Sequence, residues 1–251
     1  MTDLWQPRSR CDVGCLPTPG ATPRVLPPVL LWRVAALIAV VLAGAAMLPP
    51  LPRLMPNFAR AVLWCLGVRL SIRGQLPTRQ ALIVANHVSW MDILVMLAAT
   101  PARLVAKHEV RDWPLIGAPA TAVGTIFIDR SRPRTLPVTV ANAADALRAG
   151  DVVAVFPEGT TGCGRSAGRF RPALFQAALD AGAPVVPVSL RFHLTDGEGT
   201  TAAAFLGEET LLTSLRRVLA VRGLVVSVVA GAAVHSTAGM DRRTLARVVQ
   251  S

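Results

Sequence analysis

From about residue 68 to the C-terminus, short apolar runs rich in β-branched residues alternate with segments of helical length. Continuous apolar strands separated by helices are typical of a sheet that is covered on both faces. The sequence therefore predicts an α/β fold with a mixed, largely parallel sheet flanked by helices. The expected strands are 68–73, 81–85, 103–106, 125–128, 152–156, 184–190 and 224–230, and the expected helices are 90–99, 115–122, 135–149, 171–181, 208–221 and 241–249.

The N-terminal part of the chain does not share this pattern. Residues 1–28 contain six prolines and no hydrophobic periodicity, which predicts a disordered tail. The next twenty residues, Val29–Leu48, are almost uniformly apolar and are long enough to span a bilayer, with Arg33 close enough to one end to reach the interface. Whether this segment spans the membrane, lies on it, or is a signal peptide cleaved near residues 43–45 remains open.

A second apolar segment, Met55–Val68, places Arg60 opposite a set of apolar side chains, which is typical of a helix that lies flat in the membrane interface. We therefore expect residues 29–67 to be a membrane-anchoring helical segment and residues 68–251 to form the catalytic domain.

Composition also favours a membrane location. Apolar residues make up 52% of the 251-residue chain, the mean hydropathy is +0.48 and the net charge is +11. Residues 1–80 hold nine arginines against only Asp3 and Asp12, so positive charge concentrates beside the most apolar stretch and suits anionic lipid. Nucleic acid is a poorer partner because tyrosine is absent and the basic residues do not alternate with aromatic ones. We expect the cell membrane, with the catalytic domain facing the cytoplasm, and make no prediction of the oligomeric state.

The four cysteines, at positions 11, 15, 65 and 163, show no metal-ligand spacing with the four histidines. Two lie in the proline-rich tail and one in an apolar segment. The sequence therefore indicates neither a metal site nor a disulfide framework, and a reduced domain is expected.

Residues 86–92 read Asn-His-Val-Ser-Trp-Met-Asp at the junction of an expected strand and helix. If His87 lies in the turn before the helix, its ring can reach the Asp92 carboxylate in the first turn. That carboxylate would hold one ring nitrogen and raise the basicity of the other, which could then take a proton from a hydroxyl. A second interpretation is also open: Ser89-x-x-Asp92 fits a capping box, in which Asp92 only caps the helix.

A second polar segment follows the expected strand 152–156 and reads Pro-Glu-Gly-Thr-Thr-Gly from residue 157. Glycines let backbone N–H groups approach a ligand, and the arginines that follow, at 165, 169 and 171, are suited to phosphate or carboxylate. Another strand delivers Asp129 and Arg130 at its carboxyl end, where open α/β sheets bind ligands. A solvated loop and a surface ion pair are the plain alternatives.

Four segments, in order, resemble the blocks of the glycerolipid acyltransferases, a family that includes the 1-acylglycerol-3-phosphate acyltransferases. They are Asn-His-x4-Asp (86–92), Gly-x-x-Phe-Ile-Asp-Arg (124–130), Phe-Pro-Glu-Gly-Thr (156–160) and Pro-Val-Val-Pro-Val (184–188). The resemblance spans about residues 70–190. It implies transfer of an acyl chain from acyl-CoA or acyl-carrier protein to the free hydroxyl of a membrane lysolipid, without a metal or other cofactor.

The same resemblance implies that His87 is the general base and Asp92 its orienting partner. Arg130, Glu158 and Gly159 fall at the implied acceptor site. The full set of expected substrate-binding residues is Asn86, Lys107, Arg130, Glu158, Gly159, Thr160, Arg169 and Arg171.

One position departs from the family pattern. Members that bind a phosphate acceptor commonly have a basic residue directly after Glu-Gly-Thr, where this chain has Thr161. Two acceptors therefore remain open: 1-acyl-sn-glycerol-3-phosphate, giving phosphatidate, and a lyso-ornithine lipid or other lysolipid without a phosphate. Arg165, Arg169 and Arg171 are candidates for the missing cation.

Two further classes remain as alternatives. Residues 164–168 fit Gly-x-Ser-x-Gly, the nucleophile elbow of serine hydrolases, and Asp196 and His235 follow in the hydrolase order. However, Ser166 trails the end of the expected strand by ten residues, whereas an elbow follows its strand directly. The other alternative is a membrane-bound binding protein in which His87 and Asp92 have only a structural role.

Overall fold

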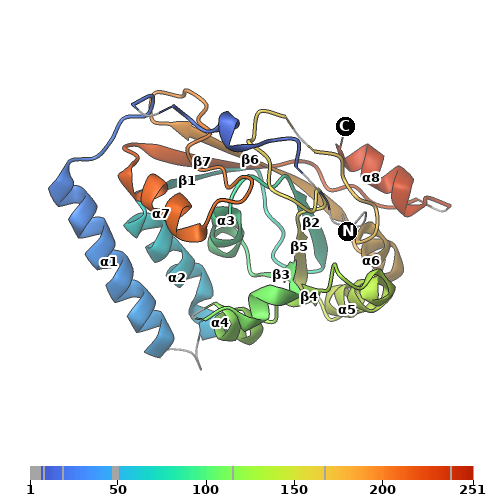
Figure 1. Cartoon of the computed structure of the whole chain (residues 1–251). Helices are drawn as coiled ribbons and strands as arrows, with labels where there is room; N and C mark the ends of the chain where they lie inside the picture. Colours follow the sequence, from blue (N-terminus) through green and yellow to red (C-terminus); the bar gives the residue numbers. More distant parts are fainter. Residues whose placement is uncertain are drawn as a thin grey trace.

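The computed structural model describes residues 7, 9–18, 20–46, 51–114, 116–166, 168–237 and 239–250. Its centre is one seven-stranded sheet in the order β1-β7-β6-β2-β5-β3-β4 (Figure 1). All neighbouring strands are parallel except β6 and β7, which are antiparallel, so the predicted mixed, largely parallel sheet is confirmed. The strands are β1 Arg69–Arg73, β2 Ala81–Ala85, β3 Ala102–Lys107, β4 Ile126–Ile128, β5 Val152–Val155, β6 Val185–Leu194 and β7 Leu224–Ala230.

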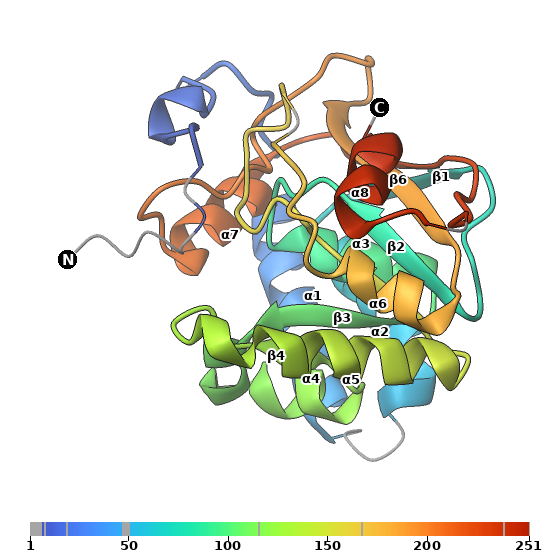
Figure 2. The same ribbon diagram turned by 90° about the vertical axis from the view of Figure 1, so that its right-hand side faces the viewer.

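Helices cover both faces of this sheet, as Figure 2 shows from a second direction. One hydrophobic cluster lies between the sheet and α2, α3 and α7, and a second lies between the sheet and α5, α6 and α8. Every residue of β2 and β5 is buried, which explains why these central strands read as continuous apolar runs. The helices are α1 Pro27–Ala46, α2 Leu51–Cys65, α3 Met91–Ala99, α4 Gly117–Ala122, α5 Leu136–Arg148, α6 Phe175–Ala181, α7 Leu211–Ala220 and α8 Arg242–Gln250.

Each strand and helix predicted for the catalytic domain is present, and the differences lie at the ends. Strand β6 continues to Leu194 because its last residues pair with β7. Helix α6 begins at Phe175 rather than at 171, since the Arg171 N–H is bonded to the Pro157 carbonyl, 2.9 Å away, instead of entering the helix. The expected start of the helix at residue 115 lies outside the described residues.

The two N-terminal helices pack side by side against the α/β domain. Trp32 of α1 and Trp64 of α2 meet edge to face, with ring centroids 6.5 Å apart. The Arg33 guanidinium does not extend to solvent; its Nη1 donates to the carbonyls of Leu219 and Val221, 2.7 and 2.8 Å away, at the C-terminal end of α7. A cation at that end of a helix satisfies free carbonyls and complements the helix dipole. Arg33 therefore fixes α1 to the catalytic domain.

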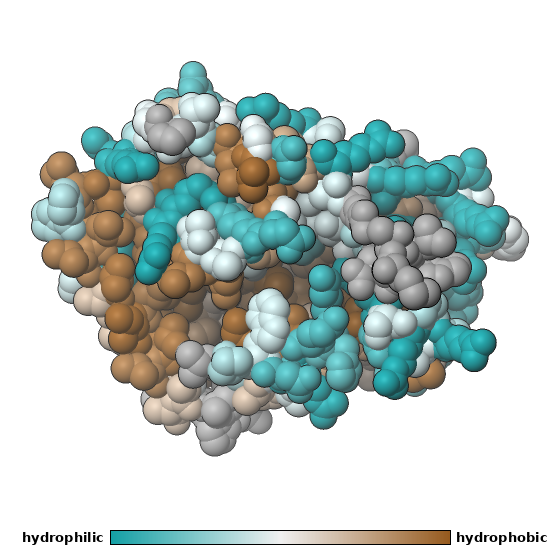
Figure 3. All heavy atoms as spheres, viewed as in Figure 1, coloured by the Kyte–Doolittle hydropathy of each residue, from teal (hydrophilic) through white to brown (hydrophobic). Residues whose placement is uncertain are grey.

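The two helices differ in what they leave exposed. Leu63 of α2 and Leu66 just after it belong to the segment expected at a lipid interface, but both are buried in the protein core, whereas Trp64 is exposed. On α1, by contrast, the large apolar side chains remain exposed, including Leu31 at 71% and Leu42 at 65%. Figure 3 shows apolar atoms gathered on this side of the molecule. Among the described residues, α1 is the one helix that is long and apolar enough to cross a membrane.

The described part of the N-terminal tail is ordered, which differs from the disorder predicted for residues 1–28. Val25 donates to the Ala220 carbonyl and Arg222 donates to the Pro23 carbonyl, so this end of the tail is pinned beside α7. Further toward the N-terminus a short 3-10 turn, Val13–Cys15, packs on the loop that follows β5. This part of the tail is ordered because it contacts distant parts of the chain, and the local composition gives no indication of such contacts.

Replacing Arg33 tests how α1 is attached. Arg33→Met keeps the apolar stem but removes two charge-assisted hydrogen bonds, which are worth about 1.5–3 kcal/mol each when partly buried. We expect faster amide hydrogen exchange in α1 and at the C-terminal end of α7. Arg60→Met is the matched control, because exposed Arg60 contacts only Asn57 on its own helix. Equal exchange in the two variants would contradict the attachment role.

Candidate active site

The turn between β2 and α3 forms one half of the candidate site. His87 follows the last residues of β2, and its Nδ1 lies 2.9 Å from Oδ2 of Asp92 in the first turn of α3. The same Oδ2 accepts hydrogen bonds from the backbone N–H groups of Val88 at 2.6 Å and Ser89 at 2.8 Å. The helix begins at Met91, one residue later than the capping pattern predicts. Asp92 therefore holds both the turn and the imidazole, so the capping and dyad interpretations describe one arrangement.

The imidazole of His87 is held on two sides. Its ring stacks on Phe156 from the end of β5, with centroids 4.2 Å apart and planes 14° apart. The His87 side chain is 18% exposed and Asp92 is fully buried. Among the described residues no partner binds Nε2, so this nitrogen is available to a ligand. A carboxylate on Nδ1 fixes the tautomer that leaves Nε2 as a proton acceptor.

The loop after β5 supplies the other half of the site. The Glu158 side chain is buried, and its Oε1 has no hydrogen-bond partner among the described residues. Burial raises the pKa of the Glu158 carboxyl, and hydrogen bonds from the backbone N–H groups of Gly168 and His87 oppose that rise. Gly159 has a φ of +74°, a left-handed conformation that favours glycine, and this turn keeps Glu158 facing inward.

The Arg130 guanidinium and the stem of the Arg171 side chain both lie beside Gly159. Arg130, delivered by the carboxyl end of β4, donates from Nη1 to the Gly159 carbonyl. Burial lowers the pKa of Arg130; the Glu109 carboxylate opposes this shift, and the nearby Arg171 charge adds to it. Like charges placed this close favour an anion between or beside them. The structure therefore brings together Arg130, Glu158, Gly159 and Arg171 as the sequence predicted.

Other expected site residues lie elsewhere. Asn86 is fully engaged with strand β6: its Nδ2 donates to the Leu190 carbonyl at 3.0 Å, and Leu190 N–H donates to its Oδ1 at 2.7 Å. Asn86 thus joins the end of β2 to β6 rather than facing a ligand. Lys107 is exposed at the end of β3, with no polar contact to the Glu158 loop among the described residues. Asp129 binds Ser131 in its own turn, and that hydrogen bond lowers the Asp129 pKa.

A cavity of about 700 Å³ adjoins the site. One wall is the loop after β5, including Glu158, Thr160 and Arg171, and the other is the N-terminal tail, including Pro7 and Cys11. The contribution of the tail was missed by sequence analysis, because a proline-rich segment carries no signal of where it packs.

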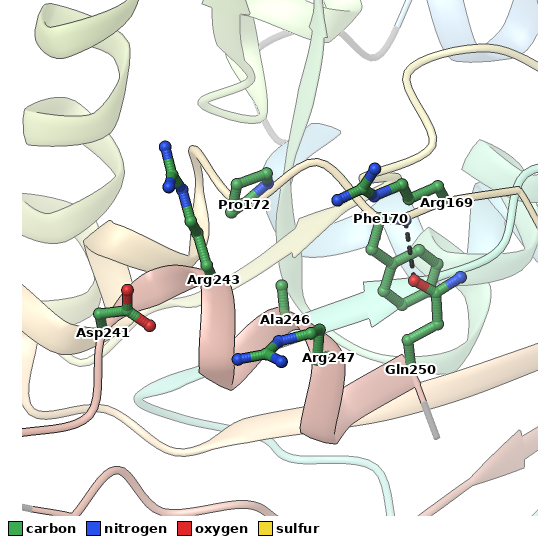
Figure 4. A pocket seen from close by; sticks show the side chains of 8 residues that line it. All are labelled: Arg169, Phe170, Pro172, Asp241, Arg243, Ala246, Arg247 and Gln250. Atoms are coloured by element: carbon green, nitrogen blue, oxygen red, sulfur yellow. Dashed lines mark hydrogen bonds between the residues drawn. The ribbon is translucent and has the colours of Figure 1, made fainter.

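Arg169 lines this cavity and also a second one of about 370 Å³. Figure 4 shows the second cavity, where Arg243 and Arg247 of α8 join Arg169. Gln250 of α8 accepts a hydrogen bond from Phe170 N–H at 3.0 Å and donates to the Gly168 carbonyl at 2.7 Å. Helix α8 thereby holds the segment that closes over Glu158. The sequence analysis made no prediction for the α8 arginines, and only the fold places them here.

The remaining polar residues of this loop have structural contacts. Thr161, at the position where a basic residue was expected, borders the cavity, and its hydroxyl donates to the Phe205 carbonyl. Ser166 is exposed and follows no strand directly, since β5 ends at Val155. His235 is exposed in a separate segment. The hydrolase elbow is therefore wrong.

Comparisons with known proteins agree with this geometry. Residues 67–191 match the family model described as Acyltransferase. The chain is 34% identical to the 1-acyl-sn-glycerol-3-phosphate acyltransferase of Neisseria meningitidis over 70% of this chain and 69% of that protein. It is 35% identical to the lyso-ornithine lipid O-acyltransferase of Pseudomonas aeruginosa over 83% and 80%. The fold is similar to that of the 1-acyl-sn-glycerophosphate acyltransferase PlsC from Thermotoga maritima, with a TM-score of 0.64, 19% identity and coverage of 88% and 90%.

The raised pKa of Glu158 predicts a pH-dependent stability. The folded state holds the Glu158 proton more tightly than the unfolded chain, so the free energy of unfolding falls as pH rises from the ordinary glutamate pKa through the raised one. The slope is at most about 1.4 kcal/mol per pH unit. Glu158→Gln removes this loss, and we expect a higher Tm than wild type at neutral pH and a smaller difference at pH 4. Exposed Glu198→Gln is the control; a Glu158→Gln protein less stable at neutral pH would contradict the argument.

Proposed function

The chain belongs to the acyltransferase family, and on that premise we propose that it transfers an acyl chain from acyl-CoA or acyl-carrier protein to 1-acyl-sn-glycerol-3-phosphate, giving phosphatidate. The enzyme class is that of the O-acyltransferases that act on lysolipids. The observation that carries the mechanism is the 2.9 Å contact between His87 and a fully buried Asp92, beside a loop with two guanidinium groups.

In the proposed reaction, Nε2 of His87 takes the proton of the acceptor hydroxyl as the hydroxyl oxygen attacks the thioester carbonyl. The tetrahedral intermediate then collapses, its carbon–sulfur bond breaks, and His87 returns the proton to the departing thiolate. The nucleophile is the acceptor itself, so no acyl-enzyme forms. Asp92 holds the imidazole in one tautomer and stabilises the imidazolium that forms between the two proton transfers.

The acceptor head group is proposed to lie at Gly159, with its anion on Arg130 and Arg171. A guanidinium fork suits the oxygens of a phosphate, and two of them supply the charge that Thr161 does not. The free Oε1 of Glu158 is placed to accept a hydrogen bond from a head-group hydroxyl. These contacts support a phosphate-bearing acceptor even though the position after Thr160 carries no cation.

A lyso-ornithine lipid is the second candidate acceptor. Thr161 points to the Phe205 carbonyl, so the loop lacks the cation that commonly follows Glu-Gly-Thr in phosphate-binding members. The ornithine lipid carries a carboxylate that two arginines also suit. Two relatives with this name, from Pseudomonas aeruginosa and Brucella abortus, match 83% and 79% of the chain, more than the 70% matched by the Neisseria meningitidis relative.

We propose that α1 attaches the protein to the membrane. Its exposed apolar side chains, Leu31, Trp32, Ile38 and Leu42, form a continuous outer surface with Trp64 of α2. Apolar patches of this kind mark a membrane or protein contact, and an interfacial tryptophan suits the head-group region. Such attachment would keep the catalytic domain at the cytoplasmic face of the cell membrane, where lysolipid and a soluble acyl donor meet.

The dyad is tested by single substitutions in an acyl-transfer assay with lysophosphatidate and acyl-CoA. We expect His87→Ala and Asp92→Asn to lower kcat by roughly 10⁴, the loss found when a triad aspartate is changed to asparagine. Ser166→Ala is the control and should keep wild-type activity. Full activity of folded His87→Ala would contradict the mechanism.

The acceptor is tested by offering the purified enzyme lysophosphatidate and lyso-ornithine lipid under the same conditions. We expect lysophosphatidate to be acylated, and Arg171→Met to raise its KM by at least about tenfold, because a charge-assisted bond to phosphate is worth roughly 1.5–3 kcal/mol. Arg165→Met, in the same loop but away from both cavities, is the matched control. Acylation of lyso-ornithine lipid alone would overturn the phosphate assignment and leave the dyad mechanism standing.

A further inference from the structure

Three cysteines that the sequence keeps apart meet between the N-terminal tail and the active-site loop. The Sγ atoms of Cys11, Cys15 and Cys163 all lie within 4.8 Å of one another. Cys163 is buried, and Cys11 and Cys15 are half-buried. The sequence showed no metal-ligand spacing because 148 or more positions separate the tail pair from Cys163. From this cluster we propose a zinc site that joins the tail to the Glu158 loop, a role independent of the proposed acyl transfer.

The distances suit a metal better than a disulfide. Zinc binds cysteine sulfur at about 2.3 Å in tetrahedral geometry, which places the sulfurs roughly 3.8 Å apart. The three thiols therefore need only small side-chain movements to close on one ion. A disulfide would use two of them and leave the third without a partner, whereas zinc would bind all three thiolates and take a water molecule as its fourth ligand. Binding releases the three thiol protons to solvent.

Hydrogen bonds already hold the backbone on both the tail side and the loop side of the cysteine cluster. The Cys163 N–H donates to the Cys11 sulfur at 3.3 Å, the kind of outer contact that orients a metal-bound thiolate. On the tail side, the 3-10 turn Val13–Cys15 is capped by Asp12, whose Oδ1 accepts from Gly14 N–H at 2.9 Å. On the loop side, Gly162 N–H donates to the His87 carbonyl at 2.8 Å. Little conformational entropy is therefore lost when the ion binds.

The site would act on the cavity beside Glu158. Pro7, Ser9, Arg10 and Cys11 form the tail wall of that cavity, and Pro7 also packs against Gly159. An ion shared by Cys11, Cys15 and Cys163 holds this wall in place. Zinc binding thus strengthens the hold of the tail over the cavity beside Glu158.

The first test is zinc binding by the reduced full-length enzyme, measured by competition with a chromophoric chelator. We expect one Zn²⁺ per chain, and a loss of affinity of at least about 100-fold in Cys11→Ser and in Cys15→Ser, whose positions in the tail leave the core unchanged. Cys65→Ala, a buried cysteine of α2 outside the cluster, should bind zinc as wild type does. Cobalt in place of zinc should give sulfur-to-cobalt charge-transfer absorption in wild type and not in the two serine variants.

The second test follows the tail itself. Trypsin cleavage after exposed Arg10 should slow when Zn²⁺ is added to wild type and should be unaffected by Zn²⁺ in Cys15→Ser. Equal zinc binding by wild type and both serine variants would overturn the proposal. So would a Cys11–Cys163 disulfide found by mass spectrometry in a wild-type protein that binds no zinc after reduction.

Discussion

One oxygen atom, Oδ2 of Asp92, organises the site. It is fully buried and accepts hydrogen bonds from Val88 N–H, Ser89 N–H and His87 Nδ1. Burying a carboxylate is unfavourable unless several donors surround it, so the arrangement holds only while all three groups stay in place. The start of α3, the turn after β2 and the orientation of the imidazole therefore depend on each other. The proposed base is held by the same bonds that begin the helix.

The direction of the strands decides which loops can reach this oxygen. β2, β3, β4 and β5 are parallel, so the segments that follow them meet at one edge of the sheet. That edge receives His87 after β2, Arg130 after β4 and Glu158 after β5. β6 is parallel to β2, whereas β7 and β1 run the other way, so the loops after those two strands open at the opposite edge. The β6 backbone instead holds Asn86, which keeps the end of β2 in register with its neighbour.

How far the sequence predicts this structure depends on sequence separation. Strands that are buried on both faces can be recognised in the sequence as apolar runs. His87 and Asp92 are only five positions apart. Both the strands and this pair could therefore be predicted from the local sequence. Contacts that form only in the assembled fold could not be predicted in this way. Arg33 on the carbonyls of α7, Cys11 against Cys163 and Arg171 beside Arg130 join segments that share no periodic pattern. The ordered tail was missed for the same reason, because its partners are distant in the chain.

Thr161, where the sequence departs from the family pattern, shows that the place of a residue in a motif does not by itself determine where its side chain lies in the folded site. In this loop the side chain after Thr160 points toward the Phe205 carbonyl, so a lysine or arginine there would have to leave that direction to reach an acceptor. The cationic groups near Gly159 come instead from Arg130 on another strand and from Arg171 beyond the glycine-rich turn. Positive charge around Gly159 is thus a property of the fold. A guanidinium pair suits phosphate and carboxylate alike, so under the proposed assignment discrimination between acceptors would fall to the neighbouring Glu158 and to the tail beside the cavity.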